Sequence, residues 1–225
     1  MCGRFVLFTT AEALLAGIGR LPGVTDVQAP QGTPGPRYNL APTQTVPVVR
    51  VGDTTARVDP ARWGLFPHWK KDGTGPPLFN ARAETLADKP SFRDAFRCRR
   101  CLVPMDGYYE WHDTGAGKVP YFVSPTGGGL LWAAGLWDTG LDRLSTTMVT
   151  TDAPEPLAWL HHRLPRLLAE EEVEQWLAGS PEQAAELLHP SPGEPVARLS
   201  VRPVSREVGN VRNDHAGLLA EAGLF

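Results

Sequence analysis

The sequence predicts an α+β fold: a single domain with a mostly antiparallel, barrel-like β core flanked by a few helices. The 225 residues, 42% hydrophobic and 21% charged, have the composition of an ordinary globular protein. Short runs with strand character outnumber helical patterns along the chain. The 22 Pro and 23 Gly are spread between these runs rather than gathered in one linker. Since there is no internal repeat either, one domain over residues 1 to 225 is the economical arrangement.

The chain begins with a strand, a helix and a loop. Residues 4 to 8 have strand character, and the segment Thr9-Thr10-Ala11-Glu12 is a capping box that opens a helix through about Ile18. Residues 21 to 37 contain four Pro and several Gly, which predicts a loop.

Most later elements are expected to be strands. They are predicted at residues 46 to 51, 102 to 103, 108 to 111, 121 to 123, 130 to 136, 146 to 150 and 198 to 204. Helices are fewer. Ser91 can cap a helix over residues 92 to 97, three apolar residues share one face of a helix near residues 169 to 178, and Pro181 starts another.

Composition excludes several classes of protein. No run approaches the roughly 20 apolar residues that span a bilayer, and the start of the chain lacks the pattern of a secretory signal. We therefore expect a cytoplasmic protein with no membrane contact. The three cysteines, Cys2, Cys98 and Cys101, are too few and too unevenly spaced for a disulfide framework, and a reducing compartment keeps them as thiols.

The net charge of -3 argues against a protein that binds polyanions over its whole surface. Charge is nevertheless unevenly distributed, because residues 62 to 100 hold nine Lys or Arg against four Asp or Glu, a net +5. This segment permits a nucleic-acid face, and by charge alone a solvated helix face is the simpler interpretation.

Cys2 is the first residue with special chemistry. Initiator Met is usually removed before a small side chain, which would leave a free α-amine and a thiol on adjacent carbons. The amine has an ordinary pKa of about 7.7 to 8.0 and the thiol one of about 8.5, so both are partly in the nucleophilic form at neutral pH. Such a pair can trap an aldehyde as an imine and then close a thiazolidine ring. The alternative is a second-position cysteine without a function.

The other two cysteines form the pattern Cys98-Arg99-Arg100-Cys101. This spacing could provide half of a zinc site or a redox motif, but the chain has no second such pair and no recognisable spacing of further ligands. We therefore expect structural cysteines and no metal site.

Four polar residues are candidates for catalysis or binding. His161 and His162 follow a predicted strand and an Asp-Ala-Pro-Glu-Pro loop, a position that often carries functional side chains. Strand alternation places Glu110 on the face of Tyr108, where it is either solvated or held in a pocket with a raised pKa. Asn80 could orient a substrate oxygen through its amide.

Taken together, seven ordered segments resemble the SRAP family (SOS response-associated peptidase), whose members shield abasic sites in single-stranded DNA by crosslinking to them. The segments are Met1-Cys2-Gly3-Arg4-Phe5, Tyr38-Asn39-Leu40-Ala41-Pro42-Thr43, Arg62-Trp63-Gly64-Leu65-Phe66-Pro67-His68-Trp69, Asn80-Ala81-Arg82-Ala83-Glu84-Thr85, Arg100-Cys101-Leu102-Val103-Pro104-Met105-Asp106-Gly107-Tyr108-Tyr109-Glu110-Trp111, His161-His162-Arg163-Leu164-Pro165 and Val204-Ser205-Arg206-Glu207-Val208-Gly209-Asn210-Val211. They run in order along the chain from residue 1 to residue 211 and so span nearly all of it. The tail after Asn213 matches loosely, so its role stays open.

The resemblance implies a role for each matching residue. Cys2 is expected to be the crosslinking nucleophile, Asn80 to position the opened sugar, and Glu110 to act as an acid or base beside the α-amine. His161, chosen over His162 because the family pattern is His, any residue, Arg, is expected to help open the sugar ring and to assist reversal. The expected DNA contacts are Arg4, Asn39, Trp63, Trp69, Arg82, Phe92, Arg93 and Arg163.

The function implied is covalent capture of abasic sites in single-stranded DNA, with weak lyase activity and no cofactor. Two alternatives remain: a thiol peptidase that uses Cys2, whose only motivated cleavage is removal of Met1, and a non-covalent reader of single-stranded or modified DNA. The expected partner is single-stranded DNA that contains abasic sites. We expect a monomer that associates with the nucleoid when it is bound to DNA.

Overall fold

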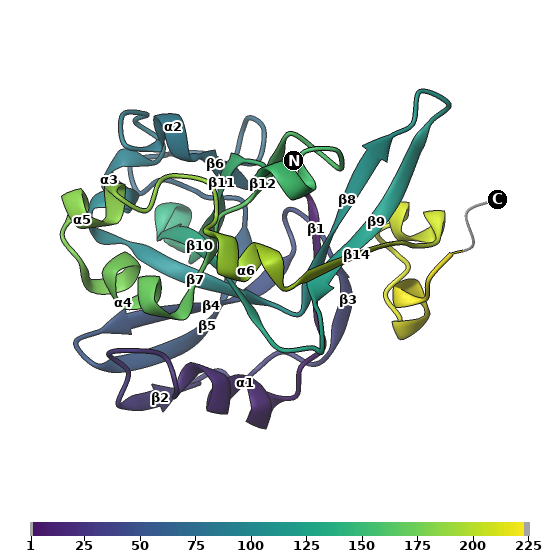
Figure 1. Cartoon of the computed structure of the whole chain (residues 1–225). Coiled ribbons are helices and arrows are strands. Elements are labelled where there is room, and N and C mark those ends of the chain that lie inside the picture. The colour runs from purple at the N-terminus through teal and green to yellow at the C-terminus, as the bar shows by residue number, and fades with distance from the viewer. Residues whose placement is uncertain (1, 223–225) are drawn as a thin grey trace.

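Five strands close into a ring in the computed structural model, which describes residues 2 to 222 (Figure 1). The ring strands are β4 (Thr45–Gly52), β5 (Thr55–Trp63), β7 (Arg100–Met105), β10 (Leu131–Asp138) and β11 (Ser145–Asp152). Antiparallel pairs link β5, β4, β7, β10 and β11 in that order. A parallel pairing, Ser145 with Arg62 and Thr146 with Trp63, closes the ring between β11 and β5.

Short strands extend the ring at its margins. They are β2 (Asp26–Gln28) on β5, β6 (Asn80–Arg82) and β12 (Arg163–Pro165) on β11, and β13 (Leu167–Leu168) on β10. Since β6 and β12 both pair with β11, the segments after residue 79 and before residue 163 are brought to one region.

A second, antiparallel sheet contains the chain start. Its strands, in spatial order, are β14 (Leu199–Pro203), β9 (Lys118–Pro125), β8 (Gly107–Asp113), β1 (Arg4–Leu7) and β3 (Arg37–Leu40). The β8–β9 hairpin projects from the body of the molecule (Figure 1). Gly107 is needed where β8 begins, because a Cβ there would lie 2.5 Å from the Val123 carbonyl and 2.6 Å from the Phe122 ring.

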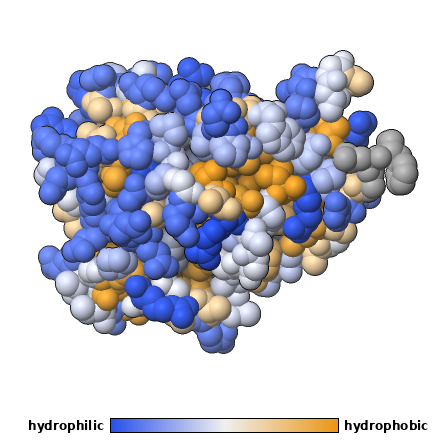
Figure 2. Space-filling model, viewed as in Figure 1, coloured by the Kyte–Doolittle hydropathy of each residue, from blue (hydrophilic) through white to orange (hydrophobic). Residues whose placement is uncertain are grey.

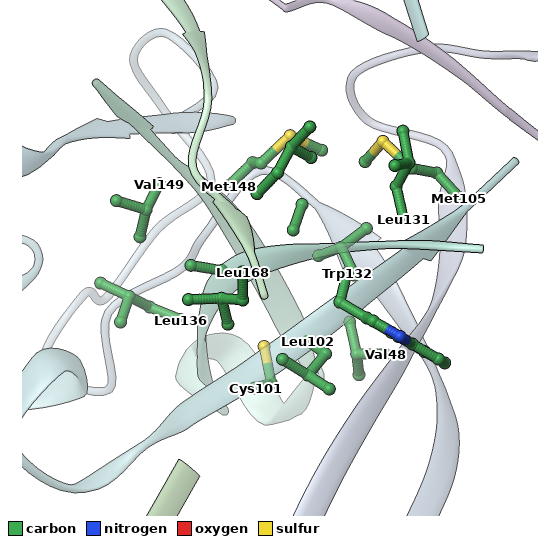
Figure 3. Packing of buried hydrophobic residues seen from close by; sticks show 14 of the residues in the cluster. Val48, Cys101, Leu102, Met105, Leu131, Trp132, Leu136, Met148, Val149 and Leu168 are labelled. Carbon is green, nitrogen blue, oxygen red and sulfur yellow. The ribbon is translucent and has the colours of Figure 1, made fainter. Parts of the chain in front are cut away.

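The interior of the ring is filled by apolar side chains from its own strands. Val48, Leu102, Leu136 and Val149, which come from four of the five strands, are fully buried and belong to one hydrophobic core (Figure 3). Such alternating β-branched and aliphatic residues explain why these segments form strands rather than helices. The predicted α+β class with a mostly antiparallel, ring-closed core is confirmed.

The helices lie at the edges of the sheets. The α-helices are α1 (Ala11–Ile18), α2 (Ala83–Leu86), α3 (Arg93–Cys98), α4 (Glu170–Ala178), α5 (Pro181–Ala185) and α6 (Gly193–Ala197). The 3₁₀ turns are η1 (Gly140–Asp142), η2 (Glu155–Leu157), η3 (Arg206–Gly209) and η4 (Ala216–Leu219). None of the helices between residues 2 and 222 has the length and apolar character needed to cross a bilayer.

Two predicted helix caps were wrong. The cap of α1 is Thr10, whose hydroxyl accepts from the Ala13 N–H, because the Thr9 hydroxyl is bonded to Asp106 instead. The Asp106 carboxylate also accepts from the N–H groups of Phe8 and Thr9, so it fixes the turn between β1 and α1. For α3 the cap is Phe92, not Ser91, and no side chain caps it.

Six strands are absent from the predicted set, namely β2, β3, β5, β6, β12 and β13. The loop expected over residues 21 to 37 contains β2, and β5 was not predicted because it contains Asp59 and Pro60. In the structure Pro60 lies opposite Pro47 of β4, so two residues without an N–H group face each other and the ladder continues on both sides.

Candidate functional site

Cys2 is completely buried at the entrance to β1, where the first strand meets the edge of the ring. The Cys2 carbonyl accepts a hydrogen bond of 2.9 Å from the Asn80 amide, and the thiol donates to the Arg4 carbonyl across 3.8 Å. Asn80 is the first residue of β6. The chain start is therefore held by a strand that is distant in sequence. Met1, whose removal the sequence predicts, lies outside the described residues.

Glu110 provides the carboxylate of the site. It lies in β8, which pairs with β1 in the register Arg4 with Tyr109, so continuation of that register brings Cys2 next to the segment that follows Glu110. Glu110 is 2% exposed and its Oε1 accepts from the Trp111 N–H at 3.2 Å. Burial raises the pKa of Glu110. The sequence left two environments open for this carboxylate, a solvated one and a buried one. The structure shows the buried one.

The thiol of Cys2 is less acidic than the sequence alone suggests. Burial raises its pKa far above the ordinary range, and the negative charge of Glu110 raises it further. The partly ionised thiol expected from an ordinary cysteine is therefore absent from the chain as described. A buried S–H beside a carboxylate instead needs a base to remove its proton before sulfur can attack.

The side-chain oxygen of Asn80 is available for a further contact. Asn80 Oδ1 is buried and has no hydrogen-bond partner among the described residues, whereas its amide nitrogen is used by the Cys2 carbonyl. A buried acceptor without a donor costs free energy, and such groups recur where a ligand completes the site. A sugar hydroxyl is a donor of the right kind.

His161 is half-buried two residues before β12. Its Nδ1 lies 2.9 Å from the Arg163 N–H, from which an unprotonated Nδ1 accepts. The same Nδ1 is 3.0 Å from the Arg163 carbonyl, to which only a protonated Nδ1 could donate. Burial lowers the pKa of His161 to about 4, which favours the neutral ring. His162 stacks on it with ring centroids 4.3 Å apart.

Arg163 holds the His161 segment in place. Its guanidinium donates to Glu84 at 2.7 and 3.0 Å, to Asp152 at 2.8 Å and to the Thr150 carbonyl at 2.6 Å. This side chain is buried and its contacts are within the protein. This placement does not fit the predicted DNA contact, because the guanidinium is used to tie β12 to β11 and α2.

Three other expected DNA contacts also lie inside the protein. Asn39 is fully buried and donates to the carbonyls of residues 208, 210 and 213, at 3.1, 3.1 and 2.8 Å. Trp63 packs edge-on against Phe5 and donates to the Phe79 carbonyl, and Phe92 is 6% exposed. These side chains support the fold, so we do not retain them as DNA contacts.

The remaining expected contacts are accessible. Trp69 is 50% exposed, Arg82 and Arg93 are exposed, and Arg4 is half-buried with its guanidinium on the Gly3 and Gly209 carbonyls. The described residues contain no cluster of three or more His, Cys, Asp or Glu that could hold a metal ion. Cys98 is exposed and Cys101 is buried, and both are free thiols.

Two residues of the site were not singled out from the sequence. Tyr108 lies on the Glu110 face of β8, and its hydroxyl is buried without a hydrogen-bond partner among the described residues. Burial, followed by the charges of Cys2 and Glu110, raises the pKa of Tyr108. Lys118 lowers the pKa of both Glu110 and His161, so its charge acts on both groups. Alternation along β8 indicates Tyr108, whereas Lys118 needs the pairing of β8 with β9.

The site therefore combines a buried cysteine at the chain start, a buried carboxylate on β8 and an imidazole just before β12. A family described as SOS response associated peptidase (SRAP) matches residues 1–211, and the chain belongs to this family.

The relatives in this family carry a common description. The chain is 32% identical over 229 residues to "Abasic site processing protein YoaM" of Bacillus subtilis, with 97% of each chain covered. It is 32% identical over 228 residues to "Abasic site processing protein YedK" of Escherichia coli, covering 97% of this chain and 99% of that one. A solved structure from Bacteroides thetaiotaomicron matches with a TM-score of 0.81 and 26% identity, covering 98% and 100% of the two chains.

Proposed function

We propose that this protein captures abasic sites in single-stranded DNA by a covalent bond to Cys2 after removal of Met1. The observation that carries the proposal is the hydrogen bond from Asn80 to the Cys2 carbonyl, which holds the future chain start beside buried Glu110. The description shared by the relatives, abasic site processing, supports the substrate.

The reaction begins with the amine. An abasic sugar is in equilibrium between a closed hemiacetal and a small amount of open aldehyde. The Cys2 α-amine adds to C1′ of the aldehyde, and loss of water gives an iminium. The Cys2 thiol then adds to the same carbon while its proton passes to a base, which closes a thiazolidine. One water is released, and no oxidant or cofactor is needed.

Glu110 and His161 divide the proton transfers. Glu110, with its raised pKa, can be protonated when it helps water to leave C1′ and ionised when it accepts the thiol proton. His161 presents a neutral ring, whose ring N–H suits donation to the ring oxygen of the closed sugar as that ring opens. The unused Oδ1 of Asn80 can accept from the hydroxyl that opening releases.

The same intermediate explains a weak lyase activity. The iminium makes the C2′ proton acidic, so β-elimination at the 3′ phosphate competes with ring closure. Thiazolidine closure removes the iminium and suppresses strand cleavage. A buried S–H held close to C1′ therefore favours protection of the strand over its cleavage.

The DNA itself is bound through accessible arginines and aromatic rings. The accessibility of Arg82 and Arg93, and the partial accessibility of Arg4, support them as phosphate contacts, and the exposure of Trp69 supports it as a stacking platform for a base. Such contacts give binding that depends on salt and little on sequence. Release of Met1, by the chain itself or by another enzyme, is the one peptide cleavage that this mechanism requires.

The test compares two serine variants. Processed protein is mixed with an abasic oligonucleotide, heated, and analysed on a denaturing gel, with mass spectrometry of the N-terminus to establish that Met1 is absent. The wild type and the control Cys98→Ser, which changes an exposed thiol, should give a heat-stable adduct. Cys2→Ser lacks the sulfur that closes the thiazolidine, so its adduct should be lost on heating. An equally stable adduct from Cys2→Ser would refute the mechanism.

A further inference from the structure

Three aromatic rings form a cluster that the proposed function does not use. The aromatic trio consists of His112, Tyr121 and Trp159. The Trp159 ring lies 5.2 Å from the Tyr121 ring and 5.3 Å from the His112 ring, both in edge-to-face geometry. Tyr121 and His112 are 6.3 Å apart. Trp159 is nevertheless 48% exposed, which is unusual for so large an apolar side chain.

The aromatic trio lies next to the groups proposed for catalysis. Tyr121 of β9 is the cross-strand partner of Glu110, so the two side chains share a face of the sheet. His112 follows Glu110 by two residues along β8 and lies on that same face. Trp159 precedes His161 by two residues in the segment after η2. Two separate parts of the chain thus bring aromatic rings to the margin of one site.

The geometry leaves room for another ring. In an edge-to-face pair, one ring contributes its edge, and its own faces stay uncovered by that partner. The exposed part of Trp159 is therefore available for stacking. Figure 2 shows one face of the molecule, where hydrophilic residues surround an apolar area near the centre.

Charge at this margin suits a nucleic-acid strand. Lys118, at the start of β9, lowers the pKa of both Glu110 and His161, so a cation acts on the region that the trio borders. A nucleotide next to the abasic residue presents both of the matching groups, a flat base and a phosphate. An aliphatic or acidic peptide presents only one of them.

We propose that the aromatic trio is a stacking subsite for the nucleobase adjacent to the abasic residue on the same strand. The inference rests on the proposed function, because it names the part of the substrate that this margin binds. Stacking on a base tolerates any sequence, since every base has a π-face. The abasic residue has no base of its own, so a neighbouring base held on Trp159 would fix the position of C1′ relative to Cys2.

The test measures binding separately from crosslinking. The ligand is a labelled single strand whose abasic aldehyde has been reduced with borohydride, so that it cannot form an imine. Two further strands replace the nucleotide on the 5′ or the 3′ side of the lesion with a spacer that has no base. Affinities for all three strands are measured by fluorescence anisotropy with wild type, Trp159→Ala, Trp159→Phe and the control Leu141→Ala, which removes an exposed apolar side chain elsewhere.

The expected result is a coupling between one base and one ring. Loss of the base on one side should weaken binding to the wild type about tenfold, and Trp159→Ala should weaken binding to the intact strand by a similar factor. When the base is missing and Trp159 is also replaced by Ala, the affinity should fall no further than with either change alone. Trp159→Phe should recover most of the affinity, and Leu141→Ala should behave as the wild type. Additive losses, or equal affinity of Trp159→Ala and wild type for the intact strand, would overturn the proposal.

A second readout reports stacking directly. 2-Aminopurine placed beside the reduced lesion should be quenched by the wild type and less quenched by Trp159→Ala. If the coupling is found but aldehyde-containing DNA gives no heat-stable adduct with the wild type, the subsite stands and the covalent function fails. If the adduct forms and no coupling is found on either side, the covalent function stands and the subsite fails.

Discussion

At the scale of single residues, the site depends on groups whose charged forms are disfavoured by burial. The pKa of Cys2 and that of Glu110 are raised, and that of His161 is lowered. All three groups are thus biased toward the neutral state. Neutral groups can exchange protons with a substrate at little cost, which is what stepwise opening of a sugar and closure of a thiazolidine require.

The neutral state of His161 predicts a pH dependence of stability. Its folded pKa of about 4 lies below the value of about 6.5 for an unfolded histidine, so the unfolded chain binds the proton more readily at acidic pH. The stability contributed by neutral His161 is therefore complete above about pH 6.5 and is lost as the pH falls toward 4. Because the ring is only half-buried, we expect a loss of about 1 kcal/mol rather than the full value.

The measurement compares wild type with His161→Gln. Urea unfolding at pH 7 and at pH 4.5 gives the free energy of unfolding of each protein, and the wild-type advantage should shrink at the lower pH by about 1 kcal/mol. An advantage that stays constant or grows between these two pH values would contradict the lowered pKa.

At the scale of elements, strand β12 and the segment before it are held by one buried guanidinium. Arg163 connects β12 to Asp152 of β11 and to Glu84 of α2. The sequence motif identifies this arginine as a candidate functional residue, but it does not show which groups the guanidinium binds. Its partners lie about 80 and 11 residues away in the chain, and only the pairing of β11 with β6 and β12 brings them together.

Arg163→Ala should separate the two interpretations of this residue. If Arg163 positions His161, its loss should reduce the crosslinking rate at saturating DNA and lower the free energy of unfolding by about 2 kcal/mol, because the buried Thr150 carbonyl loses its donor and β12 loses its ties to Glu84 and Asp152. The dependence of DNA affinity on salt should not change. A phosphate contact would instead reduce the slope of log K against log salt by about 0.7 for a single strand, with little effect on stability.

Contacts between residues distant in the sequence also explain which predicted DNA contacts failed. Asn39 and Trp63 lie in matching motifs, but their burial is set by contacts with residues 208 to 213 and with Phe79. No local pattern reports such contacts. Cys2, Asn80 and Glu110 were singled out because motif and chemistry coincide there; the structure brings Asn80 onto the Cys2 carbonyl and buries Glu110, and their roles stay predictions.

At the scale of the whole molecule, a barrel-like core and most of its longer strands were predictable, whereas the pair of strands that closes the ring was not. Local periodicity identifies β4 and β10, but the parallel pairing of β11 with β5 joins residues more than 80 positions apart. Charge was predictable only in part. Arg100, one of the nine basic residues between 62 and 100, is buried on backbone carbonyls, and Arg99 pairs with Asp138.

The protein has a net charge of -3, yet its proposed substrate is a polyanion. With some basic side chains used inside the fold, the proposed phosphate contacts are the accessible Arg4, Arg82 and Arg93. Three contacts to a single strand predict a slope of log K against log salt of about -2, since each contributes about -0.7. The affinity for a borohydride-reduced abasic strand, measured between 50 and 300 mM NaCl, gives this slope, and Arg82→Ala should reduce its magnitude by about 0.7. Arg57→Ala, at an exposed arginine outside the proposed contacts, is the matched control and should leave the slope unchanged. A slope near zero would show that phosphates contribute little, and an equal effect of the two variants would show that only net charge matters.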